Sequence, residues 1–167
     1  MTVRPFVPYP DKRLRTVCEP VEAVTDEVRA IWQDMLDTMY AMPGLGLAAP
    51  QIGVMLRLAV VDGAGDGKAP LKLANPELID VSGELREHDE GSPNLPGVSA
   101  KIKRPRKVAV RYLDAQGMLV RKDLEGVWAT SVQHQIDHLN GKMYFEHLSS
   151  TKRKMLIAKA QKLARRK

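Results

Sequence analysis

The chain has 167 residues, 44% of them hydrophobic and 28% charged, which are the proportions of one soluble globular domain. No apolar run reaches the ~18 residues needed to span a bilayer, and the first residues lack the apolar core of a signal peptide. The single cysteine, Cys18, cannot form an internal disulfide, which agrees with a reducing compartment. These properties exclude an integral membrane protein and predict one domain over residues 1–167, located in the cytoplasm.

The formal net charge of +6 is concentrated at the C-terminal end of the chain. Residues 151–167 contain eight Lys or Arg and no acid, so the rest of the chain has 18 basic and 20 acidic residues and a formal charge of −2. Apolar residues alternate with the basic ones at helical spacing, which predicts a basic amphipathic helix at about 151–167. No aromatic residues interleave, so any nucleic-acid contact would be to phosphate, and DNA is not an expected partner.

The first third of the chain predicts an irregular segment followed by a helix. Four prolines within the first twenty residues forbid a continuous helix there. Thr25 is a typical N-cap, and apolar residues then recur at three- and four-residue spacing until just before Pro43. The next segment, Gly44–Gly53, contains three glycines and predicts a tight turn with close backbone packing.

The middle and end of the chain predict strands and then a second buried helix. Met118–Leu124 and Lys107–Leu113 flank a turn at Asp114–Gly117, which is a hairpin signal. Val127–Leu139 is typical of a buried helix that stops at Asn140-Gly141. Further candidate strands are Met55–Asp62, Leu71–Ala74, Glu77–Asp80 and Glu84–Glu90, with a loop at Gly63–Lys68. Helix, several antiparallel strands and then helix predict an α+β domain.

Two histidines at helical spacing are the first candidates for chemistry. His134 and His138 stand four residues apart in the predicted helix, so their side chains project from one face and could bind one metal ion. Such a pair is by itself more often two ordinary histidines than a metal site. The surrounding motifs decide between these readings.

Three motifs, in order, resemble those of the peptide deformylase family. GLGLAAPQ at 44–51 is similar to the family's Gly-x-Gly-Leu-Ala-Ala-x-Gln, and EGSPNLPG at 90–97 stands in the place of Glu-Gly-Cys-Leu-Ser-x-Pro-Gly. QHQIDHLNG at 133–141 is similar to His-Glu-x-x-His followed by Leu-Asn-Gly. The likeness covers nearly the whole chain, and it implies mostly antiparallel sheets around a central helix that carries HxxxH. It also implies a substrate groove lined by Gly44, Leu45, Gly46 and Leu47.

The resemblance implies a definite chemistry for these motifs. Members of the family remove the formyl group from the N-terminal methionine of nascent polypeptides. A Cys thiolate and two His hold Fe²⁺ or Zn²⁺ with one position open for water, which hydrolysis at a metal requires. A Glu moves the proton, and a Gln and the backbone N–H after the Cys stabilise the oxyanion. By position, His134 and His138 correspond to the two His ligands and Gln51 to the oxyanion Gln.

The remaining positions depart from the family pattern. Ser92 replaces the Cys ligand, and a neutral hydroxyl binds such metals more weakly than a thiolate does. Gln135 replaces the catalytic Glu, so the proton shuttle is missing. Pro93 follows Ser92 and has no N–H to donate to an oxyanion, and Asn94 replaces the motif's Ser. The sequence therefore predicts impaired metal binding, with no metal expected at full occupancy.

Three functions are compatible with this pattern. The preferred one is a deformylase-like protein with little or no deformylase activity that binds N-terminal segments of nascent chains. The second is a working N-formylmethionyl-peptide hydrolase with an altered metal shell. The third is a ribosome-associated factor that acts through the basic helix at 151–167. 

Other residues near the motifs receive plainer interpretations. Ser92 with His134 as base would form a nucleophile, but no oxyanion hole accompanies it. Glu90 could replace the thiolate as a metal ligand, whereas the family resemblance implies an ion pair with Arg104. Cys18 lies far from the motifs along the chain and is expected to be an inert, small apolar side chain.

Overall fold

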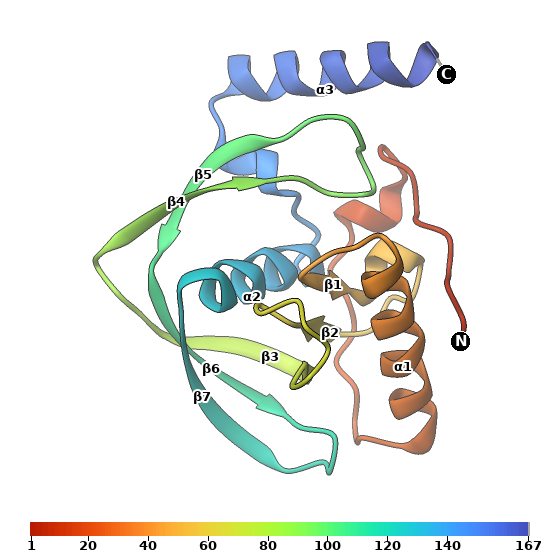
Figure 1. The fold of residues 1–167 in the computed structure, drawn as a ribbon, viewed down its shortest axis with the longest axis vertical. Coiled ribbons are helices and arrows are strands. Elements are labelled where there is room, and N and C mark those ends of the chain that lie inside the picture. The colour runs from red at the N-terminus through yellow and green to blue at the C-terminus, as the bar shows by residue number, and fades with distance from the viewer. Residues whose placement is uncertain (167) are drawn as a thin grey trace.

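A computed structural model describes residues 1–166. These residues contain three helices and two antiparallel sheets, with one helix between the sheets and the C-terminal helix at one end of the domain (Figure 1). The helices are α1 (Asp26–Ala41), α2 (Gly126–Leu139) and α3 (Ser150–Arg165), with short 3-10 turns η1 (Lys12–Arg15), η2 (Ala49–Ile52) and η3 (Tyr144–His147). The strands are β1 (Gly46–Ala48), β2 (Leu58–Val61), β3 (Leu71–Val81), β4 (Leu85–Glu90), β5 (Ala100–Pro105), β6 (Lys107–Leu113) and β7 (Leu119–Glu125).

The strands form two sheets in which every pairing between strands is antiparallel. Five strands form one sheet in the order β1-β2-β3-β6-β7, and β4 pairs with β5 in a separate ribbon. Helix α2 lies between the large sheet and this ribbon, so it is the central helix of the domain (Figure 1). The α+β class and the mostly antiparallel sheets around a helix that bears HxxxH are thereby confirmed.

Strand β2 shows how the two large helices use opposite faces of the sheet. All four of its residues are buried, and successive side chains of a strand point to opposite faces. Leu58 and Val60 pack in the cluster that contains α1, whereas Ala59 and Val61 pack in the cluster that contains α2. A continuous apolar run is therefore required here, because neither face of β2 meets solvent.

The helix boundaries follow the local signals in the sequence. The Thr25 hydroxyl accepts a hydrogen bond from the Val28 N–H at 3.2 Å and caps α1, as predicted. Helix α2 ends at Asn140, and Gly141 follows with φ of 75°, a conformation that glycine adopts without strain. A side chain on Gly141 would also meet the Arg15 backbone, with a Cβ only 2.7 Å from its carbonyl carbon. Glycine at position 141 therefore allows the chain to turn away at the C-terminal end of α2, the helix that bears the histidines.

Several strands differ from their predicted bounds. Leu71–Ala74 and Glu77–Asp80 are parts of one strand, β3, because Asn75 adopts φ of 51° and the ladder continues past it with shifts in register. The predicted strand Met55–Asp62 is shorter, at Leu58–Val61. Strand β5 was not predicted, and β1 occupies part of the segment that was expected to be only a turn.

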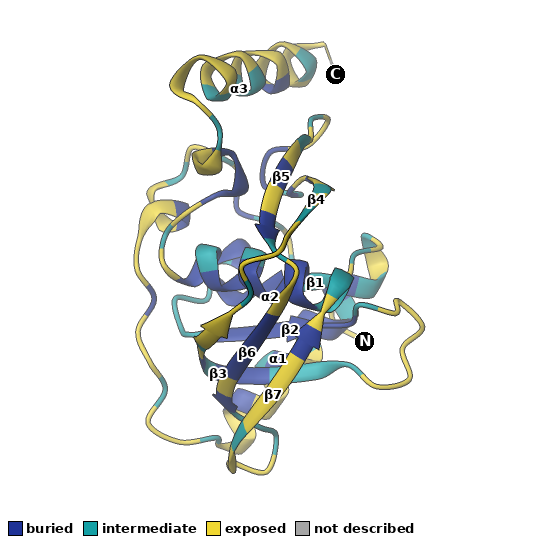
Figure 2. Ribbon diagram, turned by 90° about the vertical axis from the view of Figure 1, so that its left-hand side faces the viewer, coloured by how far each residue is buried: buried dark blue, intermediate teal, exposed yellow. Residues whose placement is uncertain are grey.

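The basic C-terminal helix lies at the outside of the domain. Helix α3 spans Ser150–Arg165, where the sequence predicts a helix at about 151–167, and Lys167 lies outside the described residues. Figure 2 shows that most of its surface is exposed, and Ala160 is its one buried residue among those described. Within residues 1–166, no helix has the length and the apolar character needed to cross a membrane.

Candidate active site

The three motifs meet at one pocket of about 390 Å³ beside α2. Gly44, Leu45 and Gly46, which the family resemblance places in the substrate groove, line this pocket. Leu47, the fourth residue expected there, is fully buried and packs in the core cluster that contains α1. From the predicted catalytic and metal-binding set, the lining includes Gln51, Pro93, His134 and Gln135.

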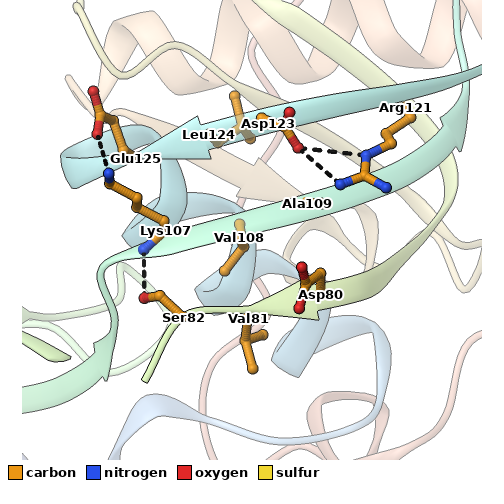
Figure 3. A pocket seen from close by; sticks show the side chains of 10 residues that line it. All are labelled: Asp80, Val81, Ser82, Lys107, Val108, Ala109, Arg121, Asp123, Leu124 and Glu125. Atoms are coloured by element: carbon orange, nitrogen blue, oxygen red, sulfur yellow. Dashed lines mark hydrogen bonds and ion pairs between the residues drawn. The ribbon is translucent and has the colours of Figure 1, made fainter. Parts of the chain in front are cut away.

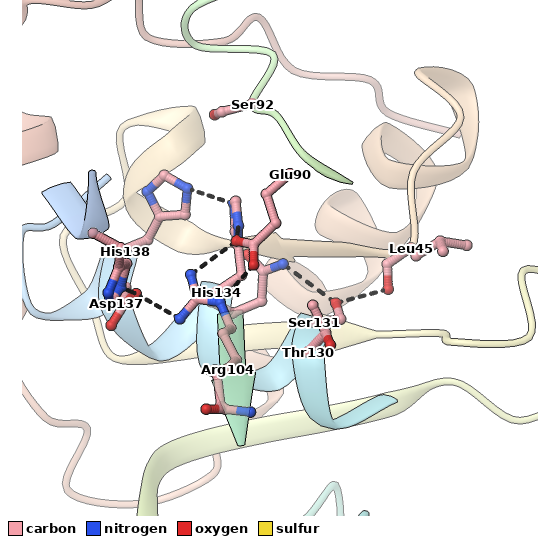
Figure 4. Close-up of polar contacts among 12 residues, drawn as sticks. Leu45, Glu90, Ser92, Arg104, Thr130, Ser131, His134, Asp137 and His138 are labelled. Atoms are coloured by element: carbon pink, nitrogen blue, oxygen red, sulfur yellow. Dashed lines mark hydrogen bonds and ion pairs between the residues drawn. The ribbon is translucent and has the colours of Figure 1, made fainter. Parts of the chain in front are cut away.

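The two histidines face each other across one turn of α2. Their Nε2 atoms are 3.2 Å apart, as Figure 4 shows. Two nitrogens that each lie ~2.0–2.1 Å from one tetrahedral ion are roughly 3.3 Å apart, so this pair has the spacing of two ligands of one metal. Burial, with a smaller effect from His134, lowers the pKa of His138 well below its usual value, so its imidazole is neutral, as a ligand must be.

An ion-pair cluster holds His134 in place. We use this name for Glu90, Arg104, His134 and Asp137. The Arg104 guanidinium donates to both Glu90 oxygens, at 2.6 and 2.8 Å, and to Asp137 Oδ2 at 2.9 Å. Glu90 Oε1 also lies 2.8 Å from His134 Nδ1, which directs the other ring nitrogen toward His138. The predicted pairing of Glu90 with Arg104 is confirmed.

The charges in this cluster are compensated despite deep burial. Burial alone would raise the pKa of Glu90, but its hydrogen bonds with His134 and Arg104 outweigh that effect and hold the pKa below its usual range. The same balance lowers the pKa of Asp137, which also contacts His147 Nε2 at 2.8 Å. Because both Glu90 oxygens are occupied, Glu90 is not free to replace the missing thiolate as a metal ligand.

Opposite α2, a network of amides occupies the segment that contains Ser92. We define the amide network as Gln51, Ser92 and Asn94, all three of which are buried. Asn94 Oδ1 accepts hydrogen bonds from Gln51 Nε2 at 2.8 Å and from Ser92 Oγ at 3.0 Å. Its Nδ2 donates to the carbonyl oxygens of Val7 at 2.7 Å and Gln51 at 3.0 Å. The side chain at position 94 therefore binds the Gln at the oxyanion position and the hydroxyl at the ligand position.

The importance of Asn94 did not emerge from the sequence, where it was noted only as a departure from the motif. Its partners Val7 and Gln51 are 87 and 43 residues away along the chain, so no local pattern could show the contacts. The one available signal was the change of residue type itself, since a buried asparagine must find partners for both ends of its amide.

Gln135 leaves one polar atom without a partner in the pocket wall. Its Nε2 donates to Ser131 Oγ at 3.4 Å, and Ser131 Oγ donates to the Leu45 carbonyl oxygen at 3.3 Å. Gln135 Oε1 is buried and has no hydrogen-bond partner among the described residues. Gly46 makes room for this arrangement, because a Cβ there would lie 2.4 Å from Gln135 Nε2.

Of the three positions that the family resemblance assigns to metal ligands, two hold histidine. Within the described part of the chain, no group of three His, Cys, Asp or Glu side chains surrounds a possible ion. The third ligand position holds Ser92, whose neutral hydroxyl is bonded to Asn94. The residues therefore fit a two-histidine site but not a site with a thiolate ligand.

Neither Cys18 nor a second hollow on the surface contributes a group to the pocket beside α2. Burial raises the pKa of the Cys18 thiol to about 11, as expected for an inert side chain. Although distant in sequence, Cys18 packs in space against Ala48 and Leu139, next to two of the motifs. A larger hollow of about 540 Å³ lies on β3, β6 and β7 (Figure 3), but it contains no residue of the three motifs.

Comparison with known proteins agrees with the fold and the motifs. Residues 3–154 match the family described as Polypeptide deformylase. The chain is 43% identical to the peptide deformylase of Rhodopseudomonas palustris strain TIE-1 over 99% of this chain and 97% of that protein, and 46% identical to that of Methylocella silvestris over 99% and 87%. The crystal structure of a peptide deformylase from Legionella pneumophila superposes with a TM-score of 0.92 at 41% identity, covering 98% of this chain and 96% of that one. This chain belongs to the peptide deformylase family.

Proposed function

We propose that this member of the peptide deformylase family binds the N-terminal segments of nascent polypeptides as a single domain and has little or no deformylase activity. One observation carries the proposal. The pocket and the support of His134 are intact, while the positions for the thiolate, the proton shuttle and the oxyanion N–H hold Ser92, Gln135 and Pro93.

Each replacement removes a different requirement of the reaction. A bound Fe²⁺ or Zn²⁺ would supply an activated water, but the chain offers it only two imidazoles and a bonded hydroxyl. The Gln135 amide exchanges no proton near neutral pH, and such a shuttle is worth ~100- to 10,000-fold in rate. Pro93 donates nothing to an oxyanion, and an oxyanion donor is worth ~100-fold or more. The Gln51 amide is already bonded to Asn94.

Restoring the family residues tests the proposal. We expect the protein to cleave a formyl-Met-Ala-Ser peptide at least ~1,000-fold more slowly than the Legionella pneumophila enzyme, because two such contributions are missing. The triple variant Ser92→Cys, Pro93→Leu, Gln135→Glu should bind one equivalent of iron or zinc and gain at least ~100-fold in rate. Ser99→Cys, which adds a thiol at an exposed position outside the pocket, is the matched control and should change neither quantity.

The spacing of the two Nε2 atoms favours one alternative, a working hydrolase with an altered metal shell. This alternative requires that the unmodified protein carry a stoichiometric metal and turn over formyl-Met peptides at a normal rate. Metal analysis by mass spectrometry and a steady-state assay with added Fe²⁺ or Zn²⁺ measure both. A positive result in both would overturn the proposed loss of activity.

Helix α3 supports a second proposal, contact with the ribosome through RNA phosphates. It carries six Lys or Arg and no acid between Ser150 and Arg165, and most of these side chains are exposed. Binding to purified ribosomes should weaken steeply between 50 and 200 mM salt, as counterion release predicts. Lys152→Glu with Lys159→Glu should abolish binding, whereas Lys122→Glu with Lys142→Glu, elsewhere on the surface, should not. Equal loss from both pairs would refute a specific role for α3.

A further inference from the structure

The wall of the pocket next to α2 contains a hydrogen-bond acceptor that has no partner in the part of the chain that the structure describes. Gln135 Oε1 is buried at this wall and has no partner within residues 1–166. The Gln135 side chain is only 4% exposed, so bulk solvent does not readily satisfy this oxygen. A buried acceptor without a partner costs free energy, and a ligand that donates a hydrogen bond removes that cost.

The orientation of the Gln135 amide follows from its neighbours. The Leu45 carbonyl oxygen can only accept, so the Ser131 hydroxyl must use its single hydrogen there. Ser131 Oγ can then only accept from Gln135, which places the amide nitrogen on that side and leaves Oε1 as the free end. The end of the Gln135 side chain that has no partner among the described residues is therefore an acceptor, on a residue that lines the pocket.

At three lining residues, Pro93, Gln51 and Ser131, groups that could donate to a ligand are missing or occupied. Pro93 has no N–H. The Gln51 amide donates to Asn94 Oδ1 at 2.8 Å, and the Ser131 hydroxyl donates to Leu45. Thr130, which also lines the pocket, accepts a hydrogen bond from the Arg86 guanidinium at 2.9 Å. A formyl oxygen is an acceptor, so next to Gln135 Oε1 it would exchange its hydrogen bonds to water for a contact between two acceptors.

The charge at the pocket also favours a donor. Asp89 lines the pocket, is exposed and has no ion-pair partner in the described part of the chain. The charge of the neighbouring Glu90 is balanced by Arg104. An N-terminal α-ammonium carries three N–H donors and, near pH 7, a positive charge. It matches both the free acceptor and the local charge.

We propose that the pocket selects polypeptides whose N-terminal methionine is already unformylated, with the free α-ammonium group donating a hydrogen bond to Gln135 Oε1. This inference rests on the proposed function, because it names the class of N-terminal segment that the pocket binds. It reverses the preference expected of a catalyst, since the favoured ligand has the free amine that deformylation produces.

Binding of matched peptides tests the selection. Met-Ala-Ser peptides with a C-terminal fluorophore would be prepared with a free, a formylated or an acetylated amino group, and the dissociation constants measured by fluorescence anisotropy at pH 7. Mass spectrometry would verify that the formyl group stays intact. We expect the free-amine peptide to bind at least about tenfold more tightly than either blocked peptide, as one hydrogen bond to a charged group would give.

Two variants separate the role of Gln135 from general damage to α2. Gln135→Met keeps the length of the side chain and removes the acceptor, so the preference for the free amine should fall toward one. Gln133→Met makes the same change on the same helix, where Gln133 Nε2 donates to the carbonyl oxygens of Pro105 and Ala129, outside the pocket. This control should keep the tenfold preference even if it is less stable.

The outcomes distinguish the two proposals. If the formylated peptide binds as tightly as the free-amine peptide or more tightly, the selection is wrong while peptide binding stands. A preference that survives Gln135→Met also overturns it, because another group must then recognise the amine. If none of the three peptides binds, both the selection and the proposed binding function fail.

Discussion

The two sides of the pocket differ in what holds them together. On the side of α2, the ion-pair cluster uses full charges, and Arg104 is bonded to two carboxylates while only 4% exposed. On the opposite side, the amide network of Gln51, Ser92 and Asn94 contains no charge at all. The first side positions an imidazole, whereas the second side holds neutral groups that bond chiefly to one another.

The residues that position His134 and the residues at the other motif positions of the pocket therefore differ in kind. Glu90, which orients His134, matches the family motif, whereas Ser92, Pro93 and Gln135 differ from the motif residues at their positions. Replacing a single residue of a buried charged cluster lowers stability strongly, because it leaves another buried charge unpaired. Neutral positions at the pocket wall can change at lower cost. This difference in cost accounts for an intact ion-pair cluster next to neutral positions that differ from the family motifs.

Breaking the ion-pair cluster should give the largest loss of stability. Arg104→Ala leaves the Glu90 carboxylate buried without its guanidinium partner and removes one partner of Asp137. We expect the free energy of unfolding to fall by about 3–5 kcal/mol, as for other broken buried pairs. Urea denaturation followed by circular dichroism measures this change.

An exposed ion pair provides the control for Arg104. Arg106→Ala removes the pair with Glu84, in which both side chains are more than half exposed, and should cost less than about 1 kcal/mol. If the two variants lost similar stability, the cluster would not be the charged support described above, and the contrast between the two sides of the pocket would disappear.

Breaking the amide network should cost less, because its members are neutral. Asn94→Ala leaves the Val7 carbonyl oxygen and the Gln51 amide without their Asn94 partner, while the Gln51 carbonyl oxygen keeps the Val7 N–H, and we expect a loss of about 2–3 kcal/mol. Thermal and urea unfolding measure it. Asn140→Ala removes an exposed hydrogen bond to Arg57 and should lose under about 1 kcal/mol. A loss at Asn94 as large as that at Arg104 would contradict the ranking of the two sides.

Local signals in the sequence predicted the elements that depend on local contacts. The cap at Thr25, the stop at Gly141 and the hairpin between β6 and β7 are each set by residues close together in the chain. Strand β6 has the predicted bounds, Lys107–Leu113, because a helix and a neighbouring strand bury its alternating apolar side.

Long-range contacts explain what the sequence could not predict. Strand β5 was missed because one of its inward positions is Arg104, a charged residue that breaks the apolar alternation. Its burial makes sense only with Glu90 and Asp137, which come from other elements. The unpartnered oxygen of Gln135 could not be predicted from the sequence either. It depends on hydrogen bonds that involve Ser131 and the carbonyl oxygen of Leu45, the residue before β1.

Asp62 provides a third comparison, because it is a charged residue that holds Leu45, a residue of the pocket wall. Asp62 is buried, accepts hydrogen bonds from Tyr40 Oη at 2.7 Å and from the N–H groups of Gly65 and Gly67, and its own N–H binds the Leu45 carbonyl oxygen at 2.9 Å. Burial would raise the pKa of Asp62, but these hydrogen bonds outweigh it and lower the pKa.

The smallest of the three effects follows from that pKa. Because the pKa of Asp62 is lower in the folded chain, its contribution to stability is complete above the unfolded pKa of ~3.9 and is lost as the pH falls through the folded pKa. Asp62→Asn should therefore lose about 1–2 kcal/mol at pH 7, and the gap to the unmodified protein should shrink as the pH falls below ~3.9. Urea unfolding at a series of pH values measures the gap, with Asp66→Asn, an exposed change in the same loop, as the control. If the difference in free energy of unfolding stayed constant with pH, the charge of Asp62 would not stabilise the pocket wall at Leu45. The ion-pair cluster would then remain as the charged group that stabilises the pocket.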